Sequence, residues 1–470
     1  MKRSELENIY PKLDFGSRKI HKFKMKKIIS LFLCLLLFPV ASNASVSLRI
    51  DGVNIPKIKV LINSNQNSPQ NYAVKRDLDQ IAAQIKRNLE GTDLFDVNQK
   101  PVTVVNISDV TKELSVEKVP NFPSYSSSGV DMLLVMDAAF NPSGELEIKA
   151  RFWDVLDERQ LFGKFYSSSQ NNYKRLANLI SDEIFKVVSG EKMGNFDSKI
   201  VYVAESGSAL RRIKRIAMMN FDGTDHRYLT SGRELVLTPI FAKQRNEVFF
   251  VRFFGEKPQI YNLDLTNALL RKVGGFRGMT FAPTVNPADP NIIAFSVIDR
   301  GNSNIYQMNL FTNQIDRLTT TKAIDTTPSY SPDGKYIVFS SDRTGNEQLY
   351  IMESDGSGTR RISNEGGNYS KPMWSPDGKY IAFTKLRANQ FSIGVMNVDG
   401  KNEKTLTSGY LVEGAKWSPS GRYLIYSRKN AAYGKQSIPK LYIVDALTGF
   451  DRELPTPPNE GATDPDWAMN

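Results

Sequence analysis

The stretch KPMWSPDGKYIAF, from Lys371 to Phe383, recurs along the second half of this chain. Its copies are TPSYSPDGKYIVF (Thr327–Phe339), GAKWSPSGRYLIY (Gly414–Tyr426), the looser TPIFAKQRNEVFF (Thr238–Phe250) and APTVNPADPNIIAF (Ala282–Phe295), and DPDWAMN from Asp464. The fourth residues of the copies, which serve as markers, are Phe241, Val285, Tyr330, Trp374, Trp417 and Trp467, at spacings of 44, 45, 44, 43 and 50 residues. A period of this size is typical of β-propeller blades.

Each repeat contains the strands that one blade needs. Ser-Pro-Asp-Gly predicts a turn, because Pro sets the first φ, Asp caps the backbone and Gly accepts a positive φ. In the repeat at Ser331 an apolar strand follows at Tyr336–Phe339, a second at Gln348–Met352, and a short outer strand at Thr359–Ile362. With the strand at the start of the repeat this makes four. Such units stack face to face around an axis, because one unit cannot bury both of its own faces.

The two ends of the repeat region complement each other. Ile200–Thr230 reads as strands two to four of a repeat that lacks its first strand, and the fragment around Trp467 is a first strand with nothing after it. Together they complete one blade, so that five whole repeats and this shared blade make six. Sharing a blade in this way leaves no open sheet edge where the ring closes.

The residues before the repeats predict a separate domain. Residues 45–190 alternate expected strands with two amphipathic helices, Asp77–Leu89 and Tyr173–Val188. The strands expected there are Val46–Ile50, Lys57–Ile62, Val130–Phe140, Glu145–Trp153 and Leu161–Tyr166, with a long loop at Glu113–Ser128. The fold class is therefore a two-domain one. We expect a small N-terminal α/β domain at 45–190, a linker at 191–198, and a six-bladed β-propeller at 199–470, with the C-terminal strand closing the first blade.

The first 44 residues predict export. Lys26 and Lys27 precede an apolar run, Ile28–Val40, which is short for a membrane span, and small residues follow it. We expect translation to start at Met25 and a signal peptidase to cleave between Ala44 and Ser45; the alternative is an uncleaved anchor. Cleavage would remove 9 of 61 Lys and Arg and 3 of 50 Asp and Glu, which lowers the net charge from +11 to about +5. This modest charge argues against a nucleic-acid partner.

Catalytic motifs are scarce in the expected mature chain. Its one histidine, His226, follows a predicted turn and is expected to be solvated, and there is no cysteine after Cys34. Neither a nucleophile elbow nor a phosphate-binding loop is present. The repeated Asp-Gly pairs lack the spacing of calcium loops and read as turns. We therefore expect no enzyme and no cofactor. The alternative is a propeller hydrolase, similar to a lactonase, that uses carboxylates and a calcium ion in its channel.

The order of these parts resembles the TolB family of the bacterial Tol–Pal system. The resemblance rests on the leader, on the α/β domain ending in SDEIF (Ser181–Phe185), and on the repeats closed by the C-terminus. It covers nearly all of the expected mature chain. It implies a monomeric periplasmic protein that binds the lipoprotein Pal and the protein TolA. The system maintains the outer membrane and draws it inward during cell division.

The resemblance also implies where partners bind. Pal is expected at the mouth of the propeller channel, on the loops before each marker residue. The expected Pal-binding residues are Met279, Ala282, Thr326, Ser370, Glu413 and Asp464. These could instead be ordinary turn residues. The expected TolA contact is the segment Ser45, Val46, Ser47, Leu48, Arg49, Ile50 and Asp51, which could instead be an edge strand of its own domain.

Overall fold

The computed structural model describes residues 56–64, 72–98, 114–169, 172–208, 211–255, 257–276, 278–364, 366–430 and 438–470. The leader, the cleavage pair Ala44–Ser45 and the expected TolA segment Ser45–Asp51 lie outside these ranges, so the predictions made for them stay predictions.

A five-stranded sheet organises the N-terminal domain. Its strands are β1 (Ile58–Ser64), β2 (Phe95–Asn98), β3 (Met132–Phe140), β4 (Leu146–Asp154) and β5 (Arg159–Ser168). They follow the order β2-β1-β3-β4-β5, in which β1 runs parallel to β2 and β3 while β3, β4 and β5 are antiparallel. The strand β2 was not predicted, because four residues with two polar side chains carry almost no periodic signal.

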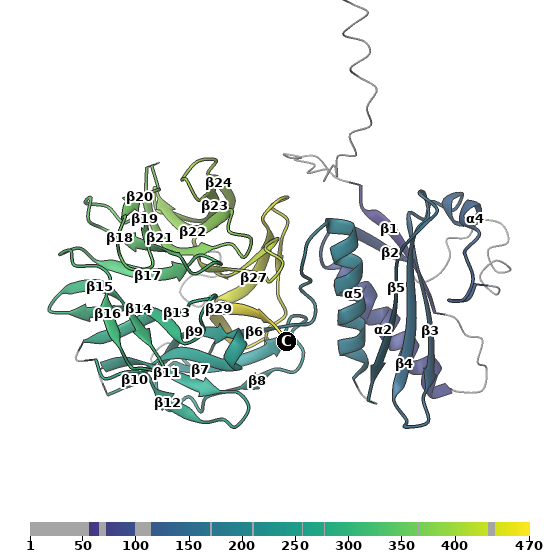
Figure 1. The fold of residues 1–470 in the computed structure, drawn as a ribbon, viewed down its shortest axis with the longest axis horizontal. Coiled ribbons are helices and arrows are strands. Elements are labelled where there is room, and N and C mark those ends of the chain that lie inside the picture. The colour runs from purple at the N-terminus through teal and green to yellow at the C-terminus, as the bar shows by residue number, and fades with distance from the viewer. Residues whose placement is uncertain are drawn as a thin grey trace, which may run out of the picture. The chain divides into compact units, whose positions relative to one another are not determined.

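Two helices cover one face of this sheet, α2 (Tyr72–Glu90) and α5 (Tyr173–Ser189), as Figure 1 shows. Their apolar stripes, which include Ile81 and Ile184, are fully buried against Ile148 and Phe152 of β4. Full burial of one such side chain contributes roughly 1.5–3 kcal/mol. The helix expected to begin at Asp77 begins at Tyr72 instead. The expected loop at Glu113–Ser128 contains a short helix, α4 (Phe122–Ser126).

The rest of the described chain forms six four-stranded sheets, as the repeat predicted (Figure 1). Blade 1 consists of β29 (Gly461–Met469), β6 (Ser198–Ser206), β7 (Ile213–Asn220) and β8 (Arg227–Tyr228). Blade 2 consists of β9 (Val236–Ala242), β10 (Glu247–Phe254), β11 (Lys257–Asp264) and β12 (Leu270–Lys272). Blade 3 consists of β13 (Met279–Val285), β14 (Ile292–Asp299), β15 (Asn302–Asn309) and β16 (Ile315–Arg317). Blade 4 consists of β17 (Asp325–Tyr330), β18 (Tyr336–Ser341), β19 (Gln348–Glu353) and β20 (Arg360–Arg361). Blade 5 consists of β21 (Asn368–Trp374), β22 (Tyr380–Arg387), β23 (Gln390–Asn397) and β24 (Lys404–Gly409). Blade 6 consists of β25 (Leu411–Trp417), β26 (Tyr423–Lys429), β27 (Lys440–Asp445) and β28 (Asp451–Glu453). A single 3-10 turn, η1 (Lys243–Arg245), joins β9 to β10.

The Ser-Pro-Asp-Gly turns have the structure that their composition predicts. In blade 4 the amide of Gly334 donates to the carbonyl of Ser331 at 2.9 Å, and Gly334 has a φ of 71°. The hydroxyl of Ser331 donates to Asp333 at 2.6 Å and accepts from the amide of Tyr336 at 3.0 Å. These bonds set the direction in which β18 leaves the turn. Blade 5 repeats them at Ser375 and Asp377.

The C-terminal strand closes the ring, as the sequence predicted. Strand β29 pairs antiparallel with β6, with Trp467 opposite Ile200. The indole of Trp467 is 1% exposed and stacks on Phe221 with 5.2 Å between ring centroids. Blade 1 is thus made of the first three strands of the propeller and the last strand of the chain, and its innermost strand is the last to be synthesised.

A buried carboxylate fastens the end of the α/β domain to the start of the propeller. Asp182 of α5 accepts hydrogen bonds from the backbone amides of Asn195, Phe196 and Asp197, at 2.6, 2.7 and 3.0 Å. A side chain at Gly194 would collide with Asp182, since a Cβ there would lie 2.0 Å from its carboxylate oxygen. Burial raises the pKa of Asp182 to about 6, although the three amides oppose this change.

Candidate functional site

The innermost strand of every blade is interrupted by a bulge at an equivalent place. The pairing between the first and second strands shifts register in all six blades. One residue at each bulge has a left-handed backbone, and these six are Thr238, Ala282, Thr327, Lys371, Gly414 and Asp464. Proline follows five of them. A residue with a Cβ pays about 1 kcal/mol or more for this conformation, so the bulges are features that the rest of the fold sustains.

Every predicted Pal-binding residue lies at or near a bulge. Ala282 and Asp464 are themselves left-handed, while Thr326, Ser370 and Glu413 each come directly before the left-handed residue of blades 4, 5 and 6. Met279 begins β13 and is 38% exposed. The structure therefore brings the predicted residues into one class of position around the ring; their binding role stays a prediction.

Blade 2 contributes a bulge residue, Thr238, that the prediction did not include. Its hydroxyl oxygen is buried and has no hydrogen-bond partner among the described residues. A signal for it was present, since Thr238-Pro239 occupies the same place in its repeat as Thr327-Pro328. The sequence analysis aligned this repeat with the others but assigned no Pal-binding residue to it.

Hydroxyl groups on the second strands support two of the bulges. The hydroxyl of Ser296 accepts from the amide of Thr327 at 3.2 Å, and the Thr327 hydroxyl lies 2.6 Å from that of Ser340. In blade 6 the Ser427 hydroxyl donates to the carbonyl of Glu413 at 3.3 Å. These bonds hold the backbone of the bulge in place and thereby the side chains next to it.

Apolar side chains are exposed at the same end of the propeller. Because successive strands of a blade alternate in direction, the loops into the first strands and the connections between second and third strands share one end of the ring, which we call the mouth. Exposed large apolar residues on these loops and at the adjoining strand ends are Ile213 (38%), Tyr228 (43%), Leu235 (41%), Phe254 (73%), Met279 (38%), Ile324 (49%), Tyr410 (62%) and Ile438 (44%). Exposed apolar residues that gather around one feature indicate a protein-binding surface. Of these residues, the sequence analysis singled out only Met279.

A group of charges from four consecutive blades lies at the mouth. The ammonium of Lys371 in blade 5 is 2.6 Å from a carboxylate oxygen of Glu413 in blade 6. Burial lowers the pKa of Lys371, but Glu413, Asp464 of blade 1 and Glu347 of blade 4 outweigh it, so that the net pKa lies above its usual value. Burial raises the pKa of Glu347, which a hydrogen bond from Ser340 opposes.

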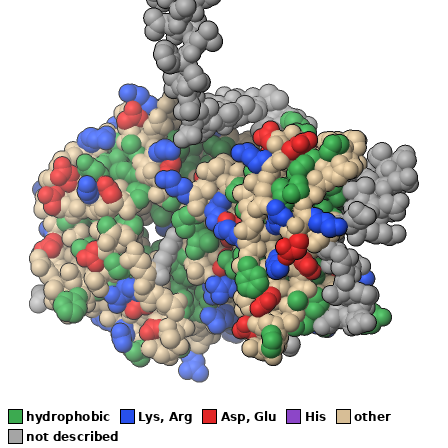
Figure 2. Space-filling model, turned by 45° about the vertical axis from the view of Figure 1, so that its right-hand side comes forward, with side chains coloured by type: hydrophobic (Ala, Val, Ile, Leu, Met, Phe, Trp, Pro, Cys, Tyr) green, Lys and Arg blue, Asp and Glu red, His purple; other side chains and the backbone are tan. Residues whose placement is uncertain are grey.

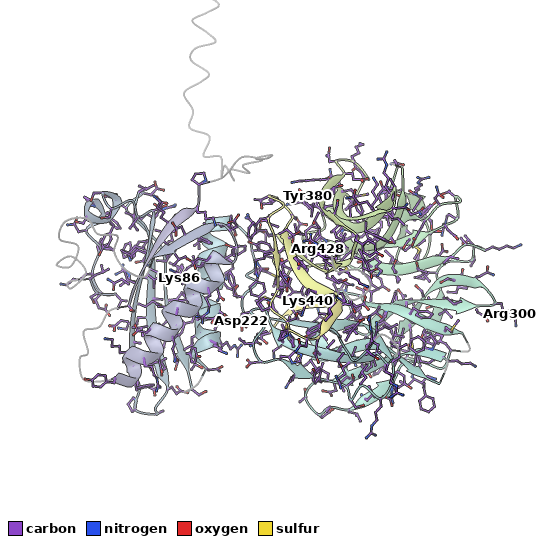
Figure 3. The ribbon with its side chains drawn as sticks, turned by 180° about the vertical axis from the view of Figure 1, so that it is seen from behind. Lys86, Asp222, Arg300, Tyr380, Arg428 and Lys440 are labelled. Carbon is purple, nitrogen blue, oxygen red and sulfur yellow. The ribbon has the colours of Figure 1, made fainter. Side chains whose placement is uncertain are left out.

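The remaining surface mixes charges of both signs. On the face that Figure 2 draws, Lys and Arg side chains are interspersed with Asp and Glu rather than gathered into one patch. At the mouth, Arg300 lies at the tip of the hairpin between β14 and β15 (Figure 3) and is exposed beside Asp299. A surface of mixed charge suits a protein partner better than a polyanion.

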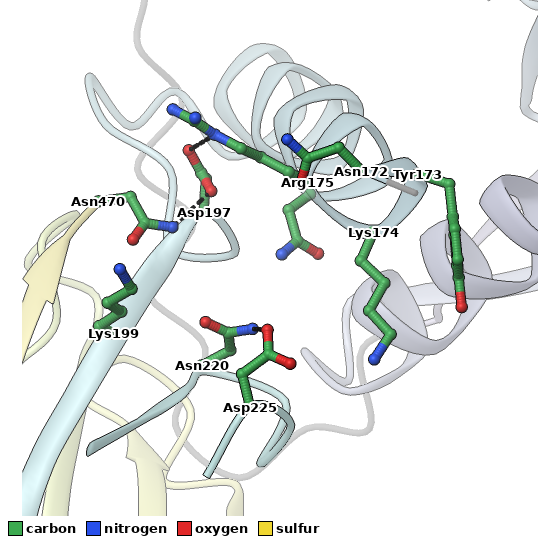
Figure 4. A pocket seen from close by; sticks show the side chains of 10 residues that line it. Asn172, Tyr173, Lys174, Arg175, Asp197, Lys199, Asn220, Asp225 and Asn470 are labelled. Atoms are coloured by element: carbon green, nitrogen blue, oxygen red, sulfur yellow. Dashed lines mark hydrogen bonds and ion pairs between the residues drawn. The ribbon is translucent and has the colours of Figure 1, made fainter. Parts of the chain in front are cut away.

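A polar cavity of about 560 Å³ beside the first turn of α5 is a second candidate (Figure 4). Its charged lining consists of Lys174, Arg175, Lys199, Asp197 and Asp225. Arg175 already pairs with Asp197 at 3.3 Å, and Asn220 donates to Asp225 at 2.6 Å. Much of the lining is already paired with other lining residues, and the cavity contains both positive and negative charges. It therefore indicates no particular class of ligand as clearly as the mouth does.

His226, the one histidine of the expected mature chain, lies among aromatic rings. It packs its ring against Tyr202 and Tyr228, at 6.1 and 5.0 Å between ring centroids. The residue is half-buried and its Nε2 atom is buried without a hydrogen-bond partner among the described residues, so this histidine is less solvated than expected. Within the described ranges, no three His, Cys, Asp or Glu side chains are grouped so that they could hold a metal ion. A calcium ion in the channel stays an untested prediction.

Fold and site together define a class: a six-bladed propeller behind an α/β domain, closed by its own C-terminal strand and carrying an apolar, charged mouth. The model of the TolB amino-terminal domain matches residues 46–161, and that of the TolB beta-propeller domain matches residues 185–470. The chain belongs to the TolB family. None of the helices in the described part of the chain is long and apolar enough to cross a membrane.

A solved structure of a TolB has a similar fold. The crystal structure of TolB from Acinetobacter baumannii has a TM-score of 0.76 at 22% identity, over 88% of this chain and 97% of that one. A protein described as a TolB from Agrobacterium tumefaciens matches 58% of this chain and 99% of its own, with 19% identity and a TM-score of 0.46. An oligogalacturonate lyase in complex with manganese covers 54% of this chain and 72% of its own, at 15% identity and a TM-score of 0.37. Likeness that low supports no enzymatic function for this chain.

Proposed function

We propose that this chain is a periplasmic scaffold of the Tol–Pal system and that its mouth binds the lipoprotein Pal. The observation that carries the proposal is the mouth itself, where exposed apolar residues lie at the same end of the propeller as the loops that lead into the left-handed bulges of all six blades. Membership of the TolB family supports the assignment to this system. In this role the chain links Pal to TolA, maintains the outer membrane and takes part in its invagination during division.

The mouth has the composition of a protein interface. Aromatic anchors such as Phe254 and Tyr410 dominate interface energetics when a partner desolvates them. The bulges hold the residues between these anchors in fixed positions, which lowers the entropy lost on binding. The second contact, with TolA, is proposed for Ser45–Asp51 through addition of a strand to a sheet of TolA.

Calorimetric titration of the full mature chain with the soluble domain of Pal from the same organism tests the proposal. Ala282→Trp and Thr326→Trp are expected to lower the affinity at least tenfold, because a bulky group would fill the mouth. Lys379→Trp is the matched control, since Lys379 is 72% exposed in a turn at the opposite end of the propeller. Near-UV circular dichroism checks that each variant is folded.

Two results would contradict the Pal proposal: absence of binding by the unaltered chain, or unchanged affinity in both mouth variants. The TolA contact is tested separately. Deletion of Ser45–Asp51 is expected to abolish binding of TolA and to leave the affinity for Pal unchanged. Full binding of TolA by the deletion variant would refute that part.

A further inference from the structure

Lys371 at the mouth faces three carboxylates, those of Glu347, Glu413 and Asp464. Glu413 is bound to Lys371 at 2.6 Å, whereas Asp464 and Glu347 form no ion pair with any described residue. This group of described residues therefore holds three negative charges against one positive charge.

The loops of the mouth also carry exposed cations, Arg233, Lys257, Arg300, Lys322 and Arg387, and none of them forms an ion pair with a described residue. Other cations near this end are neutralised, as Arg252 is by Glu234 at 2.8 Å and Arg343 is by Asp325 at 2.9 Å. Anions lie on the same loops, among them the exposed Asp299 beside Arg300, so that the mouth outside the Lys371 group is mixed in sign.

We infer that the partner inserts a lysine or arginine side chain into the mouth beside Asp464 and Glu347. The inference rests on the proposed function, because it assumes that a protein docks here. An inserted cation would pair with Asp464 and Glu347, which share Lys371 with Glu413 and form no ion pair with a described residue. An inserted carboxylate would instead have to displace Glu413 from Lys371 and would meet the other two acids.

Glu347 shows why an inserted cation would be favoured. Its carboxylate is half-buried, and burial raises its pKa, so that its ionised form is incompletely stabilised in the free protein. A cation placed beside it replaces the lost solvation with a direct ionic interaction. Complementary charge of this kind also determines orientation and discriminates between partners.

Three variants test whether the group that the partner inserts is a cation or a carboxylate. Asp464→Asn and Glu347→Gln each remove one negative charge and are expected to weaken binding of the soluble Pal domain about three- to tenfold at low salt. Lys371→Met removes the competing cation and is expected to strengthen binding by a similar factor. Asparagine tolerates the left-handed backbone at position 464, so the bulge should persist.

The matched control is Asp355→Asn, which removes a carboxylate from an exposed turn at the opposite end of the propeller and should leave the affinity unchanged. The salt dependence of Pal binding should also become shallower when Asp464 and Glu347 are both neutralised. Weaker binding by Lys371→Met, or unchanged or tighter binding by Asp464→Asn and Glu347→Gln, would overturn the inference. If the unaltered chain still binds the Pal domain, such a result leaves the proposed function intact. Failure of the unaltered chain to bind Pal would instead refute the proposed function.

Discussion

The indole nitrogen of Trp467 donates a hydrogen bond to the hydroxyl of Ser198 at 2.7 Å, across 269 residues of chain. The two residues belong to the last and the first strand of the propeller, β29 and β6. Since the same indole stacks on Phe221, a single side chain joins the closing strand to two other segments of blade 1.

We predict that Trp467→Ala lowers the free energy of unfolding by about 3–5 kcal/mol, the usual cost of removing a buried tryptophan. Deletion of Asp464–Asn470 should cost more, because it leaves β6 with an unpaired edge. Chemical denaturation measures the free energy of unfolding of both variants, and hydrogen exchange shows which strands open.

Trp417→Ala is the control, because it removes a similarly buried ring from blade 6. In this variant, faster exchange should stay within blade 6 and its neighbours. Unaltered stability of the deletion variant would contradict the role of β29.

Asp182 should make stability depend on pH in an unusual direction. Its folded pKa, about 6, lies above the ordinary value of 3.8, so the folded state binds the proton more tightly than the unfolded state does. The contribution of this group to stability is therefore present below about pH 4 and is lost as the pH rises to about 6. The change is roughly 3 kcal/mol at most.

The comparison between the native chain and Asp182→Asn isolates this effect, since asparagine does not titrate. Charged and titratable groups near Asp182, namely Asp197, Arg175, Glu183 and Tyr166, are the same in both proteins. Relative to the native chain, the variant should gain stability between pH 4 and pH 7 in urea denaturation. A difference between the two proteins that does not change with pH would show that Asp182 does not titrate in this range.

Lys440 should hold the loop that leads into the closing strand. Its ammonium donates to the carbonyls of Pro457, Pro458 and Glu460 and to the hydroxyl of Thr456, at 2.9 to 3.4 Å. Figure 3 shows it beside the last strands of the propeller. Lys440→Met is expected to cost about 1–3 kcal/mol, because carbonyls lose a charged donor.

Hydrogen exchange provides the specific readout for Lys440, since the amides of β29 should exchange faster in Lys440→Met. Lys404→Met is the control, because the Lys404 ammonium donates to a single exposed carbonyl, that of Leu447, at 2.8 Å. Equal exchange rates for β29 in the two variants would argue against this role.

Ala282 tests whether the bulges are strained. Glycine adopts the left-handed backbone without the Cβ clash, so Ala282→Gly should be neutral or stabilise the fold by up to about 1 kcal/mol. Ala294→Gly, in the neighbouring strand of the same blade, should instead destabilise it by about 1 kcal/mol, because Ala294 is fully buried in regular strand. Thermal and urea denaturation compare the two. A similar loss in both variants would mean that the bulge carries no strain.

Much of the architecture was predictable from local chemistry. The turn at Ser331 and its copy at Ser375 have a fixed composition, and their period predicted six blades and the position of Trp467. The start of α2 at Tyr72 was missed, because the first turn of this helix has no acidic residue and only a weak apolar pattern. Strand β2 exists because β1 and α2 provide partners for Phe95 and Val97, which a local pattern cannot show.

The mouth was predictable in position but not in detail. The repeated X-Pro pair before the marker residues indicates an irregular first strand, yet the left-handed backbone depends on pairing with the second strand. The ion pair between Lys371 and Glu413 depends on how neighbouring blades meet. Exposure of Phe254 and Tyr410 depends on what surrounds each loop, and no single repeat contains that information.

The shared first blade has a consequence for how this chain is made. The ribosome delivers β6, β7 and β8 early, but the strand that completes their sheet, Gly461–Met469, emerges after every other part of the propeller. The ring therefore cannot close before nearly all of the chain is available to fold. With the export proposed above, this order of strands would complete the mouth only after the C-terminus has reached the periplasm.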